Sequence, residues 1–262
     1  MTIVAVVQAR SSSSRLPGKV MLPIMGEPML SRQVDRIVRA ESLDKIVVAT
    51  STETGDDAIQ NLCNTIGVEC FRGSLDDVLG RFDACAALYN ADVVVRLTGD
   101  CPLTEPEVID TVVRNHVRNR ADYTSNVHPP TWPDGLDVEV VNRDVLSHAA
   151  ANARLSSERE HVTSYVTSRK VVFSMSNVET SPDRSDLRLT VDEPRDFDLV
   201  TRIFEALLPA NPEFTLEDVL ALLDSNPEWM GINAGIDRNE GSRPLQGGSG
   251  DHQTEQRSED AP

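Results

Sequence analysis

The chain has 262 residues, and its 42 acidic side chains against 25 basic ones give a formal net charge of -17. This charge disfavours nucleic-acid binding, which requires a basic face to neutralise phosphates. No apolar run approaches the ~20 residues that span a membrane. The N-terminus leads directly into an apolar strand, so we expect no secretory signal, no membrane partner and a cytoplasmic location. The four cysteines and five histidines show no zinc-binding spacing, and we expect the cysteines to be reduced thiols.

The excess of acids is accompanied by a scarcity of lysine. Only Lys19, Lys45 and Lys170 are lysines, so arginine supplies most of the positive charge. Such a composition is typical of a high-salt cytoplasm, where salt screens the repulsion among the acids. We therefore predict that molar KCl raises the melting temperature in a thermal-denaturation series. A flat or falling response would contradict this halophilic interpretation.

The first half of the chain alternates strands with helices. The patterns predict strand–helix pairs at 2–8 and 28–39, 45–50 and 56–66, 68–71 and 75–88, and 92–97 and 105–118. This alternation indicates an α/β fold, in which helices cover both faces of a largely parallel sheet.

After Arg120 the rhythm changes. The patterns predict strands over 122–127, 136–141, 171–175 and 186–190, and helices over 143–152, 156–169, 194–207 and 216–223. From 236 onward Gly, Ser, Gln and charged residues dominate. We therefore expect one domain over 1–235 and a disordered tail over 236–262.

The loop after the first strand concentrates positive charge and small residues. Arg10, Arg15 and Lys19 flank a run of serines at 11–14. Small residues let backbone N–H groups approach a phosphate, while arginine offers a planar fork and lysine a mobile point charge. The pattern therefore favours an anion-binding loop at the carboxyl end of a strand, although a solvated basic loop would look the same. Neither the Walker pattern nor the dinucleotide-binding glycine pattern is present.

Two later acids also follow predicted strands. Asp100 lies in the loop after the strand that ends at Leu97, and Asp192 follows the strand predicted over 186–190. Carboxylates at the carboxyl ends of strands face the same crevice, and Mg²⁺ prefers such hard oxygen ligands. Each Asp could instead cap the helix that follows, and Pro194 strengthens that alternative for Asp192.

Other polar residues leave two interpretations open. Asp137 and Glu139 alternate along a predicted strand and share a face, which either contacts a ligand or is solvated. His161 follows Glu160 near a helix start, where capping-box spacing explains part of the pattern. The segment 72–74 precedes a helix N-terminus and either binds an anion or caps the helix.

Several of these motifs occur together in one known family. They are Gln8-Ala9-Arg10-x-x-Ser13-Ser14-Arg15-Leu16-Pro17-Gly18-Lys19, Arg72-Gly73-Ser74-x-Asp76-Asp77-Val78-Leu79, Arg96-Leu97-Thr98-Gly99-Asp100-Cys101-Pro102-Leu103, Asp122-Tyr123-Thr124-Ser125-Asn126, Glu160-His161-Val162-Thr163 and Leu189-Thr190-Val191-Asp192-Glu193-Pro194. From Val4 to about Leu223 the chain resembles the sugar-acid cytidylyltransferases, which activate Kdo and the acylneuraminates. The resemblance is strongest to the branch named for the spore coat polysaccharide biosynthesis protein F.

This resemblance implies a Rossmann-like nucleotidyltransferase fold, a three-layer sandwich with a mixed central sheet. It implies transfer of a nucleoside monophosphate from an NTP to a sugar or sugar acid, with release of pyrophosphate. CTP is the expected donor, while GTP and UTP stay open. The resemblance also implies Mg²⁺ at Asp100 and Asp192, catalytic roles for Arg10, Lys19 and Asp100, and a homodimer formed through about 122–175.

Two sets of ligand contacts follow from the same resemblance. The nucleotide is expected to contact Gln8, Ala9, Arg10, Ser11, Ser13, Ser14, Arg15, Lys19, Arg72, Ser74 and Asp77. The acceptor is expected to contact Asn126, Asp137, Glu139, Glu160 and His161, with Arg154, Arg159 and Arg188 as candidates for binding its carboxylate.

Two other functions compete with this one. A glycosyltransferase with a similar nucleotide-binding domain predicts an Asp-x-Asp pair at the metal site, but Asp100 is followed by Cys101-Pro102. A non-catalytic nucleotide-binding or docking protein predicts loss of residues such as Lys19 and Asp100, and both are present.

Overall fold

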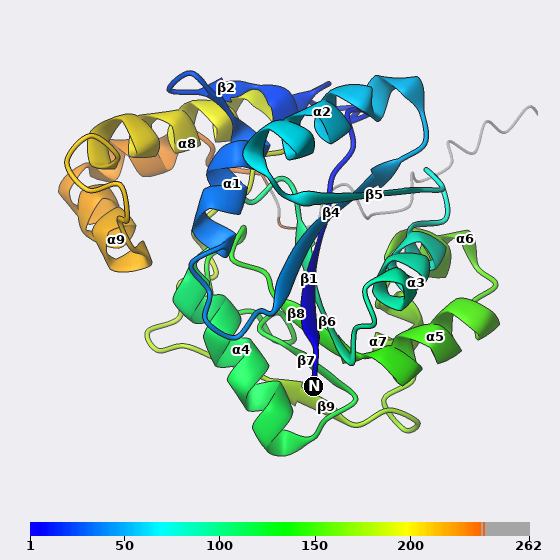
Figure 1. Cartoon of the computed structure of the whole chain (residues 1–262). Helices are drawn as coiled ribbons and strands as arrows, with labels where there is room; N and C mark the ends of the chain where they lie inside the picture. Colours follow the sequence, from blue (N-terminus) through cyan, green and yellow to red (C-terminus); the bar gives the residue numbers. More distant parts are fainter. Residues whose placement is uncertain (237, 239–262) are drawn as a thin grey trace, which may run out of the picture.

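The computed structural model describes residues 1–236 and residue 238. Its centre is a seven-stranded sheet in the order β5-β4-β1-β6-β8-β7-β9 (Figure 1). Within it β8 runs antiparallel to both of its neighbours, so the sheet is mixed. The strands are β1 (Ile3–Gln8), β4 (Lys45–Ser51), β5 (Glu69–Gly73), β6 (Val93–Thr98), β7 (Tyr123–Ser125), β8 (Glu139–Asn142) and β9 (Met175–Asn177). A separate pair is formed by β2 (Pro23–Ile24) and β3 (Glu27–Pro28).

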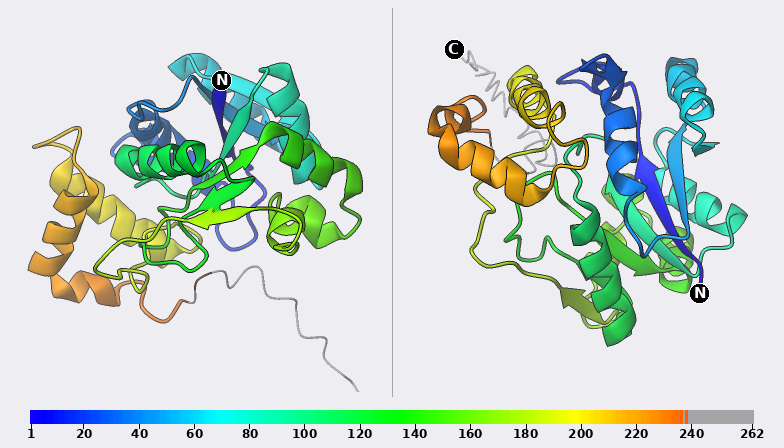
Figure 2. Two further views of the ribbon diagram at one scale, coloured as in Figure 1. Left: turned by 90° about the horizontal axis from the view of Figure 1, so that it is seen from below. Right: turned by 60° about the vertical axis from the view of Figure 1, so that its left-hand side comes forward.

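Helices cover both faces of the sheet, which confirms the predicted three-layer α/β sandwich (Figures 1 and 2). One layer contains α1 (Met29–Ile37), α2 (Asp57–Ile66), α4 (Pro106–Asn119), α8 (Pro194–Leu207) and α9 (Leu216–Ser225). The other contains α3 (Val78–Leu88), α5 (Arg143–Asn152) and α7 (Ser164–Thr167), beside the short α6 (Ser156–Glu160). Three 3-10 turns complete the described elements: η1 (Lys19–Met21), η2 (Thr54–Asp56) and η3 (Pro227–Gly231). No helix of the described residues is long and apolar enough to cross a membrane.

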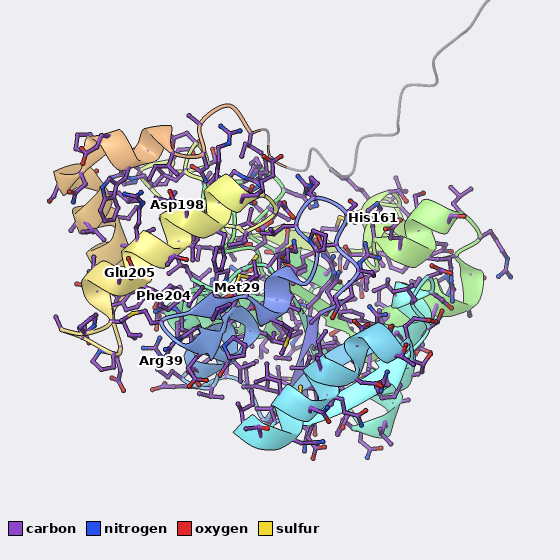
Figure 3. All side chains as sticks on the ribbon, turned by 90° about the horizontal axis from the view of Figure 1, so that it is seen from above. Met29, Arg39, His161, Asp198, Phe204 and Glu205 are labelled. Atoms are coloured by element: carbon purple, nitrogen blue, oxygen red, sulfur yellow. The ribbon has the colours of Figure 1, made fainter. Side chains whose placement is uncertain are left out.

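The central strand β1 explains why the core has two halves. Ala5 and Val7 pack into the cluster that includes α1, α4 and α8, whereas Val4 and Val6 pack into the cluster under α3 and α5. A strand buried on both faces is apolar throughout, as expected in a parallel sheet with helices on both sides. In the first layer α8 lies beside α1, and Phe204 and Met29 belong to one buried cluster (Figure 3).

The strand register brings the functional loops to one edge of the sheet. Gln8 at the end of β1 pairs with Thr98 at the end of β6, and the antiparallel β8 brings Glu139 opposite Arg96. The loop after β6 then lies against the loop after β1. A Cβ added at Gly99 would lie 2.9 Å from the carbonyl oxygen of Gln8, so this approach requires glycine.

Several predicted elements of the second half were wrong in place or extent. The segment 186–190 is no strand: it makes only an isolated bridge between Asp134 and Arg188, because single hydrogen bonds tie it to loops at the sheet edge. The strand predicted over 171–175 is found at 175–177, and Val171 is fully exposed. The helix predicted over 156–169 divides into α6 and α7, since the backbone of Val162 has a positive φ of 42°.

The predicted tail lies outside the described residues except for residues 236 and 238. These two contact the folded part: Ile236 lines a small cavity beside Leu187, and Arg238 pairs with Asp137. The domain boundary at 235 and the disorder of the tail stay predictions.

Candidate functional site

A cavity of about 360 Å³ opens at the carboxyl edge of the sheet. Most of the residues predicted for the site line it: Gln8, Ala9, Arg10, Ser13, Ser14, Arg15, Lys19, Asp100, Asp137, Glu139, Glu160, His161 and Asp192. His161 lies beside the short helices at the rim, apart from α8 (Figure 3). Segments distant in the sequence thus meet in one place, as the positions of the strand ends predicted.

Hydrogen bonds of its own backbone N–H groups hold the first loop in place. The N–H of Ser11 donates to Asp56 at 2.7 Å, and the N–H of Gly18 returns to the carbonyl of Ser11 at 2.9 Å. Gly18 has a φ of +68°, a conformation that suits glycine. It turns the chain into η1, which begins at Lys19. The side chain of Lys19 is therefore directed back into the cavity from a buried backbone position.

Lys19 joins the two predicted metal ligands. Its Nζ donates to Asp100 Oδ2 at 2.9 Å, to Asp192 Oδ1 at 2.8 Å and to the carbonyl of Val191 at 2.9 Å. Burial raises the pKa of the Asp100 carboxyl, but the ammonium of Lys19 and the hydroxyl of Thr98 lower it more, so the pKa falls to about 2. Burial lowers the pKa of Lys19, and the two carboxylates more than offset that effect, so its pKa lies above the ordinary value. Lys19 and Asp100 are therefore both charged at neutral pH.

Capping does not explain either aspartate. The helix α4 is preceded by Glu105, and the helix α8 by Glu193, whose N–H donates to the carboxylate of Asp196. Asp100 and Asp192 instead turn their carboxylates toward Lys19. The alternative in which they serve only as helix caps was wrong.

The oxygen atoms around the Lys19 ammonium are of the kind that bind a divalent cation. Two carboxylates and a backbone carbonyl already surround one positive charge, and these are the hard oxygen ligands that Mg²⁺ accepts. The described residues contain no group of three or more Asp, Glu, His or Cys side chains that is arranged to hold a metal ion by itself. A metal ion here would therefore depend on substrate phosphates for further ligands, which is common for Mg²⁺ in phosphoryl-transfer sites.

Arg188 anchors Asp192 through a buried ion network. Its guanidinium donates to Asp196 at 2.9 Å, to Asp134 at 2.8 Å and to Asp192 at 3.0 Å. Arg15 reaches the same oxygen of Asp192 at 3.0 Å. The prediction that Arg188 binds a sugar carboxylate was wrong, because three carboxylates already occupy its guanidinium.

The acceptor residues predicted on β8 and just before it differ in their environment. Glu139 is buried, pairs with Arg96, and accepts from Tyr123 and Thr163, each at 2.6 Å. The solvated-face alternative was therefore wrong for Glu139. Asp137 faces the cavity and pairs with Arg238. Burial raises the pKa of Asp137 to about 7, with Arg238 opposing and the neighbouring Asp134 and Glu139 adding to the rise.

The raised pKa of Asp137 predicts a pH dependence of stability. The unfolded chain releases this proton near pH 4, its ordinary range, and the folded chain near pH 7. Between these values the folded state holds more protons, so this group makes stability fall as the pH rises from about 4 to about 7. We expect Asp137→Asn to remove that slope in urea-unfolding series at several pH values. The matched variant Asp224→Asn, on the exposed face of α9, should leave it unchanged; an identical slope in Asp137→Asn would contradict the assignment.

Five predicted residues do not line the cavity. The guanidinium of Arg72 ties β5 to the carbonyls of Ser51 and Glu53 and to α2. Ser74 and Asp77 belong to the N-terminal turn of α3, where Asp77 accepts from the N–H of Gly80 at 2.9 Å. A ligand-binding role for these residues stays a prediction, as it does for Ser11 and Asn126.

The other two arginines proposed for an acceptor carboxylate are also accounted for. Arg159 pairs with Asp77, and Arg154 is exposed and does not line the cavity.

Asn126 joins the two ends of the 126–138 loop. Its amide nitrogen donates to the carbonyl of Leu136, and its amide oxygen accepts from the N–H of Val138.

Three charged residues of the cavity wall were given no role in the predicted site: Arg81, Asp134 and Arg96, the last of which lies within a family motif. Arg96 interrupts the apolar strand Val93-Val94-Val95-Arg96-Leu97, and Arg81 lies between the buried Leu79 and Phe82 of α3. A charge within a buried segment is rare unless it is paired or functional, so both positions carried a usable signal.

Comparisons with known proteins agree with this geometry. The family model described as cytidylyltransferase matches residues 4–224. An uncharacterized protein of Methanocaldococcus jannaschii is 37% identical over 238 residues, covering 90% of this chain and 96% of that protein. The spore coat polysaccharide biosynthesis protein SpsF of Bacillus subtilis is 31% identical over 234 residues, covering 86% of this chain and 95% of its own.

A solved structure gives the same result. The cytidylyltransferase from Leptospira borgpetersenii superposes with a TM-score of 0.85 at 31% identity, covering 91% of this chain and all of that one. The match includes the first loop and the loops that carry Asp100 and Asp192. This chain belongs to the cytidylyltransferase family.

Proposed function

We propose that this protein transfers CMP from CTP to a sugar or sugar acid, with release of pyrophosphate, in the synthesis of a surface polysaccharide. The observation that carries the proposal is the convergence of Lys19 on Asp100 and Asp192 inside a cavity that is also lined by Arg10 and Arg15. Family membership supports the transfer of CMP, and the relation to SpsF supports a place in polysaccharide synthesis.

The residues of the first loop suit a triphosphate. Arg10 and Arg15 offer forked donors, and Lys19 offers a mobile charge, at the mouth of a loop whose serines leave the backbone accessible. In this reaction an acceptor oxygen attacks the α-phosphorus in line and the bond to pyrophosphate breaks. Catalysis of such a step consists mainly of positioning and charge neutralisation, which fixed cations supply.

Mg²⁺ is proposed as the cofactor, with Asp100 and Asp192 as its protein ligands. When bound, it would neutralise charge that develops on the phosphates. Lys19 contacts the same carboxylate oxygens, so ammonium and metal compete for them in this conformation. Asp100 and Asp192 have their positions fixed in advance by Lys19 and by Arg188.

The acceptor is proposed to enter on the side of Asp137, Glu160 and His161, which line the same cavity. Dimerisation through about 122–175 and a cytoplasmic location are proposed on the family resemblance. The exposed Val171 and Val172 in that region support the dimer, since large apolar side chains in solvent often mark an interface.

The test is pyrophosphate release from CTP and Mg²⁺ in the presence of a panel of sugar acids. We expect Asp100→Asn to lower kcat about 100- to 1000-fold, because a neutral amide cannot hold the cation that neutralises the phosphates. Asp198→Asn is the matched control, since Asp198 lies on the outer face of α8 (Figure 3). Near wild-type turnover in a folded Asp100→Asn variant would refute the proposed metal site.

A further inference from the structure

One buried arginine of the cavity makes no close ion pair among the described residues. Arg81 on α3 is only 3% exposed, yet it lines the cavity. Its Nη1 donates to the carbonyl of Ser74 at 2.7 Å. Its Nε has no hydrogen-bond partner, and its guanidinium makes no ion pair within the part of the chain that the structure describes. Burying an unpaired charge costs several kcal/mol, so this arrangement calls for a compensating ligand.

The position of Arg81 is built into the fold. Val78, Leu79 and Phe82 of the same helix are buried around it. A Cβ added at Gly73, at the end of β5, would lie 2.9 Å from Cγ of Arg81 and 3.2 Å from its Cβ. Real Cβ contacts essentially never come that close, so glycine at 73 leaves the space that the arginine stem occupies.

Arg81 also faces a second cation. Burial and then repulsion from Arg10 lower the pKa of Arg81, and the carboxylates of Asp56 and Asp77 offset only part of that effect. Arg10 lines the cavity too, and its nearest carboxylate, Glu160, is 3.9 Å away with both side chains about half exposed. Such an exposed pair neutralises little charge.

The other cations of the wall are already neutralised among the described residues. Lys19 and Arg15 lie against Asp192, and Arg96 lies against Glu139. The uncompensated positive charge is therefore concentrated at Arg81 and Arg10.

We propose that Arg81 is a phosphate-binding residue, which together with Arg10 binds the phosphate chain of the nucleotide and of the pyrophosphate product. This inference rests on the proposed function and adds a residue that lies outside every motif of the first loop. Gly73 acts as a positioning residue, because it determines where the arginine stem runs.

The test is isothermal titration of pyrophosphate and of CTP, each with Mg²⁺, into the full chain. Loss of a charge-assisted hydrogen bond predicts that Arg81→Met weakens both ligands about 10- to 100-fold. Arg81→Lys keeps the charge and should recover part of the loss. Arg114→Met on the exposed part of α4 is the control and should bind as the wild type does.

Gly73→Ala gives a second variant in case Arg81→Met does not fold. It retains every polar group but crowds the arginine stem, so we expect several-fold weaker pyrophosphate binding in a protein with near-normal circular dichroism. Wild-type affinities for pyrophosphate and CTP in a folded Arg81→Met variant would overturn the inference while leaving the proposed function intact. If the wild type bound pyrophosphate through Arg81 but did not bind CTP, the proposed function would be overturned and the phosphate-binding role of Arg81 would stand. If the wild type bound neither, both would be overturned.

Discussion

Replacement of Lys19 by methionine is expected to lower kcat for CTP-dependent transfer about 100- to 1000-fold, the loss typical when one fixed donor to a developing anion is removed. Lys19 is buried, and its ammonium is the only cation in the described cavity that contacts both Asp100 and Asp192. Methionine has a similar length and keeps the packing, so the change removes charge rather than volume.

The same variant separates two possible roles of the lysine. If Lys19 only neutralised the two carboxylates, added Mg²⁺ would replace it, and turnover would recover at high metal concentration. If Lys19 also binds phosphate, as proposed, kcat stays low at saturating Mg²⁺ even though less Mg²⁺ is needed for half-maximal activity. The control is Lys45→Met, at an exposed pair with Glu69 on β4, which should leave kcat unchanged. A Lys19→Met enzyme with wild-type kcat would refute the assignment.

Replacement of Arg188 by methionine is expected to destabilise the fold by about 3–5 kcal/mol, the range for breaking a buried ion network from one side. The guanidinium joins Asp134, Asp192 and the fully buried Asp196, which in turn accepts from the N–H groups of Asp192 and Glu193 at the start of α8. Without Arg188, Asp196 keeps a buried charge that has lost its cation.

Urea unfolding measures this effect, with Arg202→Met as the control. Arg202 forms an exposed pair with Asp198 on α8 and should change stability by no more than about 0.5 kcal/mol. Arg188 also positions Asp192. We therefore expect the folded Arg188→Met protein to bind Mg²⁺ more weakly, so that half-maximal turnover requires a higher Mg²⁺ concentration. Equal stability of the Arg188→Met variant and the wild type would contradict the network described here.

The sequence could predict the first half of the fold, where strands and helices alternate regularly and the resulting sheet is parallel. Apolar strands followed by amphipathic helices give β1, β4 and β6, and their carboxyl ends necessarily lie at one edge. That reasoning was enough to bring Lys19 and Asp100 together. Asp192 joins them from a segment that is no strand, so its place followed from the family resemblance and not from a strand end.

The sequence could not predict which partner each charge chooses. Arg72 resembles an anion-binding residue in its motif, yet it ties β5 to the carbonyl of Ser51 on β4 and to the carboxylate of Asp57 on α2. The segment 186–190 resembles a strand, yet its residues serve the Arg188 network instead of a sheet. Both outcomes depend on where distant loops lie, and no local spacing encodes that.

The central claim is that this cavity binds CTP with a divalent cation. The most direct test is a thermal shift in molar KCl and Mg²⁺ with CTP, UTP, GTP or ATP, where a ligand at ~100 times its Kd adds ~2.7 kcal/mol of stability. We predict a Mg²⁺-dependent rise in melting temperature that is largest with CTP and that Asp100→Asn loses. No shift with any NTP, or a larger shift with another NTP than with CTP, would contradict the account.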